Sequence, residues 1–374
     1  MTHFPDQPLR HDPAAGHPLI HDGDGLTPEW LTAVLRAAGV LSDGAVTGVT
    51  QEPIGHGMLG LNLRLKLTYD GDASGAPERL VAKMAALGEE SRESGASLNL
   101  YMRETRFYQE LAPRIRTGLP RAFFADHSDD GRTFCLLFED MAPARMGDQL
   151  EGCSVADARA AMKTAAALHA PLWEDPALPK MEWIDRSTVT ALYQQTLPNY
   201  LPEFEKRMKH LLEPEAMNVA KGYAACIEKY FTLHAAPWTV SHQDYRLDNM
   251  MFDARGGALP LAVLDWQTFV PGPGALDVSY FNGAGLLPDD RRQHEESLAR
   301  LYHEALQAQG VSDYSWAQCW HDYRLHAAHG LNMSIVGTAI TTPTERGDRM
   351  LSTMVNRHAR QMIDLGTLAL IESA

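Results

Sequence analysis

Alternation of apolar and polar residues dominates the first 140 residues of the chain and predicts strands. Residues 61–69 carry a leucine at every second position between polar residues, which is the period of a half-buried strand. A strand is also predicted for 46–54, and a returning strand for 80–84 after an intervening loop. The continuous apolar run at 134–138 predicts a buried strand.

Helical spacing of apolar residues replaces this alternation further along the chain. One early helix is expected to begin at Pro28 with Thr27 as its cap, and another covers 98–112. Further helices are predicted at 156–172, 188–233, 289–309, 316–336 and 347–373. Strands that precede helices in this way predict an α+β fold with a small β-rich lobe and a larger, mostly helical lobe. The expected boundaries are a flexible lead-in at 1–24, an N-lobe at 25–138 and a C-lobe at 139–374.

Composition narrows the class of protein. The formal net charge of −15 over 374 residues argues against general binding to nucleic acid or an anionic membrane, since both need clustered Lys and Arg. Four scattered cysteines without a C-x-x-C pair favour reduced thiols. The chain does not open with a basic segment followed by an apolar one, and no stretch approaches roughly 18 apolar residues. We therefore expect a cytoplasmic monomer or homodimer.

The strongest chemical motif is His242-x-Asp244-x-x-x-x-Asn249, and Asp265 ends the apolar run 261–264 that follows it. A loop with Asp and Asn, then a strand that delivers a second Asp, is typical of the catalytic floor of kinase-like phosphotransferases. Asp244 is expected to orient and deprotonate an acceptor hydroxyl. Asn249 and Asp265 are expected to hold Mg²⁺ through oxygen atoms. A solvated polar loop with the same letters is the alternative.

Three upstream features fit the phosphate half of such a site. Gly55, Gly57 and Gly60 form a G-x-G-x-x-G motif that a strand follows, which favours a kinase glycine loop over a dinucleotide site; a plain β-turn is the alternative. Lys83 lies in the returning strand and either faces solvent or pairs with an anion, because burying it unpaired is costly. Glu104 follows on the next helix, either as the partner of Lys83 or as an exposed helical glutamate.

Residues near the motif have more than one interpretation. We expect His242 to brace the loop rather than act as the base. Arg246 and Asp248 either pair with each other or reach the substrate, and pairing is favoured. Asp277 caps the next helix or steadies the catalytic loop, with a direct role as the weaker alternative.

Other aromatic and histidine groups are ambiguous in the same way. One group either lines an apolar pocket or packs in a core: Trp183, Tyr193, Tyr200 and Phe204. Three histidines share a predicted helix without the spacing and nearby acid that a zinc site prefers: His321, His326 and His329.

In their order along the chain, these motifs resemble the aminoglycoside phosphotransferase/choline kinase-like superfamily, closest to its ecdysteroid-kinase-like branch and bacterial relatives. The segments that carry the resemblance are 103–108, 137–141, 168–170, 242–249 and 263–267. The resemblance implies a bilobal protein-kinase-like fold with ATP between the lobes. It also implies that Glu139 and Met141 belong to a linker whose backbone meets adenine.

The chain departs from the pattern of this superfamily and of protein kinases at three places. Gln243 replaces the usual glycine of His-Gly-Asp, His56 and Met58 stand in the glycine loop, and Asp265-Trp-Gln replaces Asp-Phe-Gly. No catalytic group is lost. We expect an ATP- and Mg-dependent kinase that phosphorylates a hydroxyl of a small, apolar or amphipathic molecule. The alternatives are an aminoglycoside-type antibiotic phosphotransferase and a nucleotide-binding pseudokinase.

Overall fold

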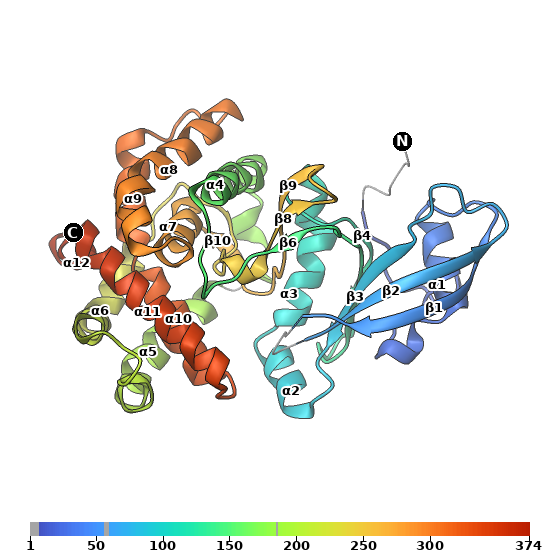
Figure 1. The fold of residues 1–374 in the computed structure, drawn as a ribbon, viewed down its shortest axis with the longest axis horizontal. Coiled ribbons are helices and arrows are strands. Elements are labelled where there is room, and N and C mark those ends of the chain that lie inside the picture. The colour runs from blue at the N-terminus through green and yellow to red at the C-terminus, as the bar shows by residue number, and fades with distance from the viewer. Residues whose placement is uncertain (1–6, 56–59, 185) are drawn as a thin grey trace. The chain divides into compact units, whose positions relative to one another are not determined.

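The structure is a computed structural model that describes residues 7–55, 60–184 and 186–374 (Figure 1). The chain divides into two compact units. Unit 1 comprises Met1–Ala142 and Leu264–Thr268, and unit 2 comprises Pro143–Val263 and Phe269–Ala374. Each is described by itself below.

Unit 1 is built on a five-stranded antiparallel sheet in the order β1-β2-β3-β5-β4. Its strands are β1 (Ala45–Pro53), β2 (Gly60–Asp70), β3 (Arg79–Ala85), β4 (Ala122–His127) and β5 (Phe134–Glu139). The four strands predicted from the sequence are confirmed, and β4 was not predicted. In β2 the alternation works as expected, because Leu63, Leu65 and Leu67 are buried in the core.

Three helices accompany this sheet: α1 (Pro28–Ala37), α2 (Glu89–Ser97) and α3 (Leu100–Arg106), which continues as a π-helical turn at Phe107–Leu111. Helix α1 packs against β1 (Figure 1), and the Thr27 hydroxyl accepts the Trp30 amide at its start. The apolar face of α1 packs into the same core as the β2 leucines.

The segment expected as a flexible lead-in contacts unit 1 over its described part. Leu9 forms a parallel bridge with Phe124 of β4, and the side chain of Ile20 is buried in the core. Residues 7–24 therefore contribute to the packing of this unit.

Unit 2 is mostly helical, and the predicted α+β class is confirmed. Its helices are α4 (Val155–His169), α5 (Arg186–Met208), α6 (Pro214–Thr232), α7 (Gly274–Gly285), α8 (Pro288–Ala308), α9 (Trp316–His326), α10 (His329–Ile340), α11 (Glu345–Leu365) and α12 (Thr367–Ser373). The helix predicted at 316–336 is two helices, α9 and α10, separated by Ala327 and Ala328. The predicted helical segments 188–233 and 347–373 are likewise divided, into α5 and α6 and into α11 and α12. Within the described ranges, no helix is long and apolar enough to cross a membrane.

The described part of unit 2 also contains five short strands, which flank its loops. They are β6 (Arg145–Met146), β7 (Thr239–Ser241), β8 (Met250–Ala254), β9 (Leu259–Val263) and β10 (Val270–Gly272). Strands β8 and β9 form a hairpin that pairs Met250 with Val263. Strand β6 pairs with the other edge of β8. Strand β7 pairs with β10, so the chain enters the predicted catalytic loop from a fully buried strand.

Buried histidines make unit 2 sensitive to acid. Burial lowers the pKa of His326 and of His358 to about 3 each. The unfolded chain takes up these protons near the ordinary pKa of about 6.5, before the folded protein does. The stability that they contribute is therefore present above pH 6.5 and is lost as the pH falls below it.

We predict that His326→Gln makes the loss of stability on acidification shallower. Because one buried titrating group is removed, the difference in unfolding free energy between pH 7.5 and pH 5 should shrink by about 2 kcal/mol. Urea denaturation at the two pH values measures it. The exposed His321 on the same helix provides the control, and an equal effect of His321→Gln would contradict the assignment.

Candidate functional site

In unit 1, Lys83 lies between two carboxylates. Its Nζ donates to Glu104 Oε1 at 2.9 Å and to Asp265 Oδ1 at 3.0 Å, and Glu104 Oε2 is 2.7 Å away. Lys83 comes from β3, Glu104 from α3, and Asp265 from the short segment that follows β9. The lysine is buried rather than solvent-facing, and the predicted Lys–Glu pair is present.

This arrangement keeps Lys83 charged. Burial disfavours the ammonium, but the carboxylates of Asp265 and Glu104 outweigh burial and raise the pKa of Lys83. Glu104 is almost fully buried, whereas the Asp265 side chain is 43% exposed. Asp265 can therefore offer an oxygen to a ligand while Glu104 holds the lysine.

The glycine loop is described only in part. Gly57 lies outside the described residues. Gly55 has φ +73°, a conformation that favours glycine. A Cβ on Gly60 would lie 3.2 Å from the Met84 carbonyl oxygen and 3.7 Å from Lys83 Cε, so Gly60 lies beside the lysine side chain.

The predicted linker lies at the end of β5. The Glu139 carboxylate accepts the Arg121 amide at 2.7 Å, and Met141 is buried. Between them, the Asp140 carboxylate pairs with Arg64 and Arg79. These side chains are engaged within unit 1, so contact with adenine would fall to the linker backbone.

In unit 2, Asp244 is the centre of a hydrogen-bonded loop. Asn249 Nδ2 donates to the Asp244 carbonyl at 2.9 Å and to its Oδ2 at 3.0 Å. Arg246 Nε donates to the same carboxylate at 3.0 Å and Tyr280 donates from its hydroxyl at 2.9 Å. Burial would raise the pKa of Asp244, but Arg246, His242 and the hydrogen bonds outweigh it and lower the pKa. Asp244 is therefore an ionised, fixed acceptor.

The Arg246 side chain is held between two acids. Its Nη1 donates to Asp248 at 2.8 Å, and Asp248 also accepts the Gln149 amide. The pairing predicted for Arg246 and Asp248 is present, and Arg246 pairs with Asp244 as well.

Asp277 steadies the catalytic loop from the first turn of α7. Its carboxylate accepts the amides of His242 at 2.6 Å and Gln243 at 2.9 Å, and the Ser241 hydroxyl at 3.0 Å. His169 Nε2 lies 3.1 Å from it. With no exposed surface, Asp277 is a scaffold for the loop, which agrees with one of the two favoured interpretations.

The Gln243 backbone is held in the left-handed region at φ +68°. His329 Nε2 lies 2.7 Å from the Gln243 carbonyl, and Gln243 Nε2 donates to the Ser241 hydroxyl at 2.8 Å. These contacts hold a conformation that the usual glycine adopts without strain.

The candidate metal ligands fit Mg²⁺ in chemistry. Both Asn249 and Asp265 offer oxygen atoms, which Mg²⁺ prefers. The Asn249 amide nitrogen donates to Asp244, so Oδ1 is the atom of this side chain that could serve as a metal ligand.

The predicted site residues therefore form two groups. Lys83, Glu104 and Asp265 come together in unit 1, and Asp244 and Asn249 come together in unit 2. Tyr280 was not predicted, since it lies in an apolar helix without a spacing signal.

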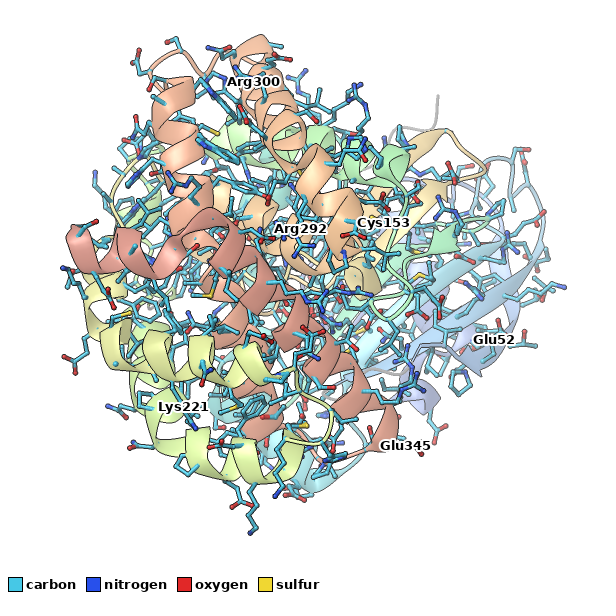
Figure 2. All side chains as sticks on the ribbon, turned by 60° about the vertical axis from the view of Figure 1, so that its left-hand side comes forward. Glu52, Cys153, Lys221, Arg292, Arg300 and Glu345 are labelled. Atoms are coloured by element: carbon cyan, nitrogen blue, oxygen red, sulfur yellow. The ribbon has the colours of Figure 1, made fainter. Side chains whose placement is uncertain are left out.

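Most of the remaining aromatic and histidine candidates contribute to packing, whereas His321 is exposed and His329 bonds to the Gln243 carbonyl. Tyr193 stacks on Phe231, Phe204 is buried, and Trp183 meets Phe269 edge to face. His326 lies against Tyr230. Among the described residues, no group of three or more His, Cys, Asp or Glu could hold a metal ion. All four cysteines are free, including Cys153 just before α4 (Figure 2).

Comparison with protein families matches residues 55–311, more than half of the chain, to the ecdysteroid kinase-like family. Among solved structures, choline kinase from Cryptosporidium parvum Iowa II is similar, with a TM-score of 0.53 at 9% identity over 87% of this chain and 92% of that one. An ethanolamine kinase from Plasmodium vivax gives a TM-score of 0.48 at 9% identity, over 92% and 89%. The ADP-bound aminoglycoside phosphotransferase APH(2'')-Ib gives 0.46 at 13%, over 85% and 95%.

A comparison with curated proteins found no match. The likeness to the choline kinase confirms the predicted protein-kinase-like fold.

We predict that Asp277→Asn destabilises the protein by about 3 kcal/mol. The asparagine amide has one acceptor oxygen, whereas the donors to Asp277 now share two carboxylate oxygens. The N–H groups of the new amide would also point at those donors. Urea denaturation measures the change. Asp253→Asn at the exposed end of β8 is the matched control, expected to stay within about 0.5 kcal/mol. Similar losses in both variants would show that Asp277 does not anchor the loop.

Proposed function

Because the chain belongs to the ecdysteroid kinase-like family, we propose that it transfers the γ-phosphoryl group of ATP to a hydroxyl of a small molecule, with Mg²⁺. The observation that carries this proposal is the Asp244 loop. Its carboxylate is ionised, fixed by Arg246, Asn249 and Tyr280, and still partly exposed. A fixed carboxylate of this kind can accept the hydrogen bond of an incoming hydroxyl and orient its oxygen for attack.

The other residues would serve the phosphate side of the reaction. Lys83 would pair with the nucleotide phosphates while Glu104 keeps its ammonium in place. Asn249 and Asp265 would hold Mg²⁺, which neutralises negative charge on the phosphates when bound. The glycine loop and the backbone at 139–141 would contact the nucleotide.

An apolar or amphipathic alcohol is the acceptor that the site supports best. The acids nearest Asp244 are already engaged: Asp248 pairs with Arg246, and Asp277 is fully buried on the loop amides. A polycationic acceptor would need carboxylates that are available to it. Sulfur and aromatic groups adjoin the loop: Met350 Sδ is 3.3 Å from Arg246, and the ring of His329, which bonds to the Gln243 carbonyl, contacts the ring of Tyr193.

Two other functions remain as competitors. An aminoglycoside-type phosphotransferase would require a cationic antibiotic to be the best acceptor. A nucleotide-binding pseudokinase would bind nucleotide without turnover, yet such a protein has no need for an Asp244 with three side-chain donors. Phosphate transfer from ATP across aminoglycosides, choline-like amines, hydroxyacyl thioesters, steroids and aromatic alcohols separates the three.

We predict that Asp244→Ala lowers turnover with the best acceptor by about 10²- to 10⁴-fold, because the hydroxyl loses the group that orients and deprotonates it. The affinity for ATP should change by less than about twofold, since Asp244 is not a phosphate ligand in this proposal. Initial rates and ATP binding by calorimetry measure the two effects. Unchanged turnover in the variant would disprove the assignment of Asp244.

We predict that Lys83→Met lowers kcat/KM for ATP by about 10²- to 10³-fold, because a charged donor to the phosphates is lost. Lys221→Met is the matched control, since Lys221 pairs with Glu205 at 2.9 Å on the surface of α6 (Figure 2). Circular dichroism checks that both variants are folded. Equal kinetics in the two folded variants would place Lys83 outside the nucleotide site.

A further inference from the structure

The residue two positions after Asp265 is a buried glutamine with defined contacts. Gln267 is 6% exposed, and its Nε2 donates to Glu104 Oε2 at 3.2 Å. Its carbonyl accepts Arg103 Nη1 at 3.4 Å. Both partners lie on α3, so Gln267 is tied to the helix that also holds the partner of Lys83.

Trp266 is attached to the same helical region. Its amide donates to Glu104 Oε1 at 3.3 Å. Its ring stacks on Phe107, with centroids 4.0 Å apart and planes within 6°, at the π-helical turn that continues α3. The Glu104 carboxylate thus receives Lys83 and both residues that follow Asp265.

Asp265 itself is in the left-handed region, at φ +64°. A non-glycine residue there is strained by about 1 kcal/mol or more and keeps this conformation only where its surroundings fix it. The contacts of Trp266 and Gln267 are among those that fix it, together with the Lys83–Asp265 pair. Loss of one of them would let the Asp265 backbone relax and its carboxylate move away from Lys83.

We propose that Gln267 is a positioning residue: through Glu104 it holds Asp265 where its carboxylate can take a metal ion. Gln267 touches neither nucleotide nor metal in this role, which rests on the function proposed above. The segment Asp265–Gln267 is then a fixed platform on α3, in which a side-chain amide occupies the position that protein kinases give to glycine.

The test compares nucleotide binding with and without metal. In Gln267→Met the side chain keeps its length and loses its donor, so the affinity for ADP with Mg²⁺ should fall about tenfold. The affinity for ADP in the presence of a chelator should change by less than about twofold. Titration calorimetry on the full chain gives both values without relying on catalysis. Turnover should fall about tenfold, while the KM of the acceptor stays within about twofold.

Two further variants keep the result interpretable. Gln267→Asn retains an amide on a shorter side chain and should give the same pattern more weakly. It replaces Gln267→Met in the test if the Met variant does not fold. Gln51→Met is the matched control, because Gln51 also donates its amide within unit 1, to the Gly23 carbonyl at 2.7 Å. It should bind ADP as the unaltered protein does under both conditions.

The outcomes separate this proposal from the function on which it rests. Equal weakening with and without Mg²⁺ would show a general packing role for Gln267 and overturn the proposal, as would unchanged binding in both. If the unaltered protein shows no magnesium-dependent ADP binding, the proposed function fails and the role of Gln267 fails with it.

Discussion

A buried carboxylate needs hydrogen-bond donors around it, because burying an unpaired polar group is costly, and this constraint organises both units. In unit 1 the carboxylate is Glu104, which draws Lys83, Trp266 and Gln267 onto one helix. In unit 2 it is Asp277, whose donors come from a buried strand, the catalytic loop and α4. Neither acid reaches solvent, so each serves to fix groups that do. The partly exposed acids Asp244 and Asp265 depend on them for their positions.

Much of the fold could be predicted because local pattern and tertiary burial agree. The leucines of β2 alternate in the sequence and in the core, and Thr27 caps α1 as its residue type suggests. Strand β4 was missed because its run of apolar residues is short and contains Asp126. The break between α9 and α10 was missed because it falls at two alanines, which favour helix and give no signal for an end.

In the candidate site, too, some residues could be predicted from the sequence and others could not. A phosphotransferase would restrict the residue types at positions 83, 244 and 265, so the order of Lys83, Asp244 and Asp265 along the chain was enough to make them candidates. The residues that hold them are chosen by packing, and many side chains could do so. Tyr280 reaches Asp244 from an apolar helix, and no spacing in the sequence connects the two.

Gln243 and Gln267, which stand where the related motifs have glycine, both make side-chain hydrogen bonds that hold the structure. Gln243 adopts a backbone conformation that glycine would adopt freely, and its side chain bonds to Ser241. Gln267 bonds to Glu104. In each case a glutamine side chain makes a contact that glycine could not make, which favours a single conformation of the neighbouring acid.

The assignment of Leu264–Thr268 to unit 1, with unit 2 on both sides of it in the sequence, limits how this protein can be divided. A fragment that ends at Ala142 would keep Lys83 and Glu104 but lack Asp265 and the stacking partner of Phe107. Its lysine would be left with one acid and its π-helical turn with an uncovered ring. Unit 1 is therefore not a module that recombination or protein engineering can transplant as one continuous piece.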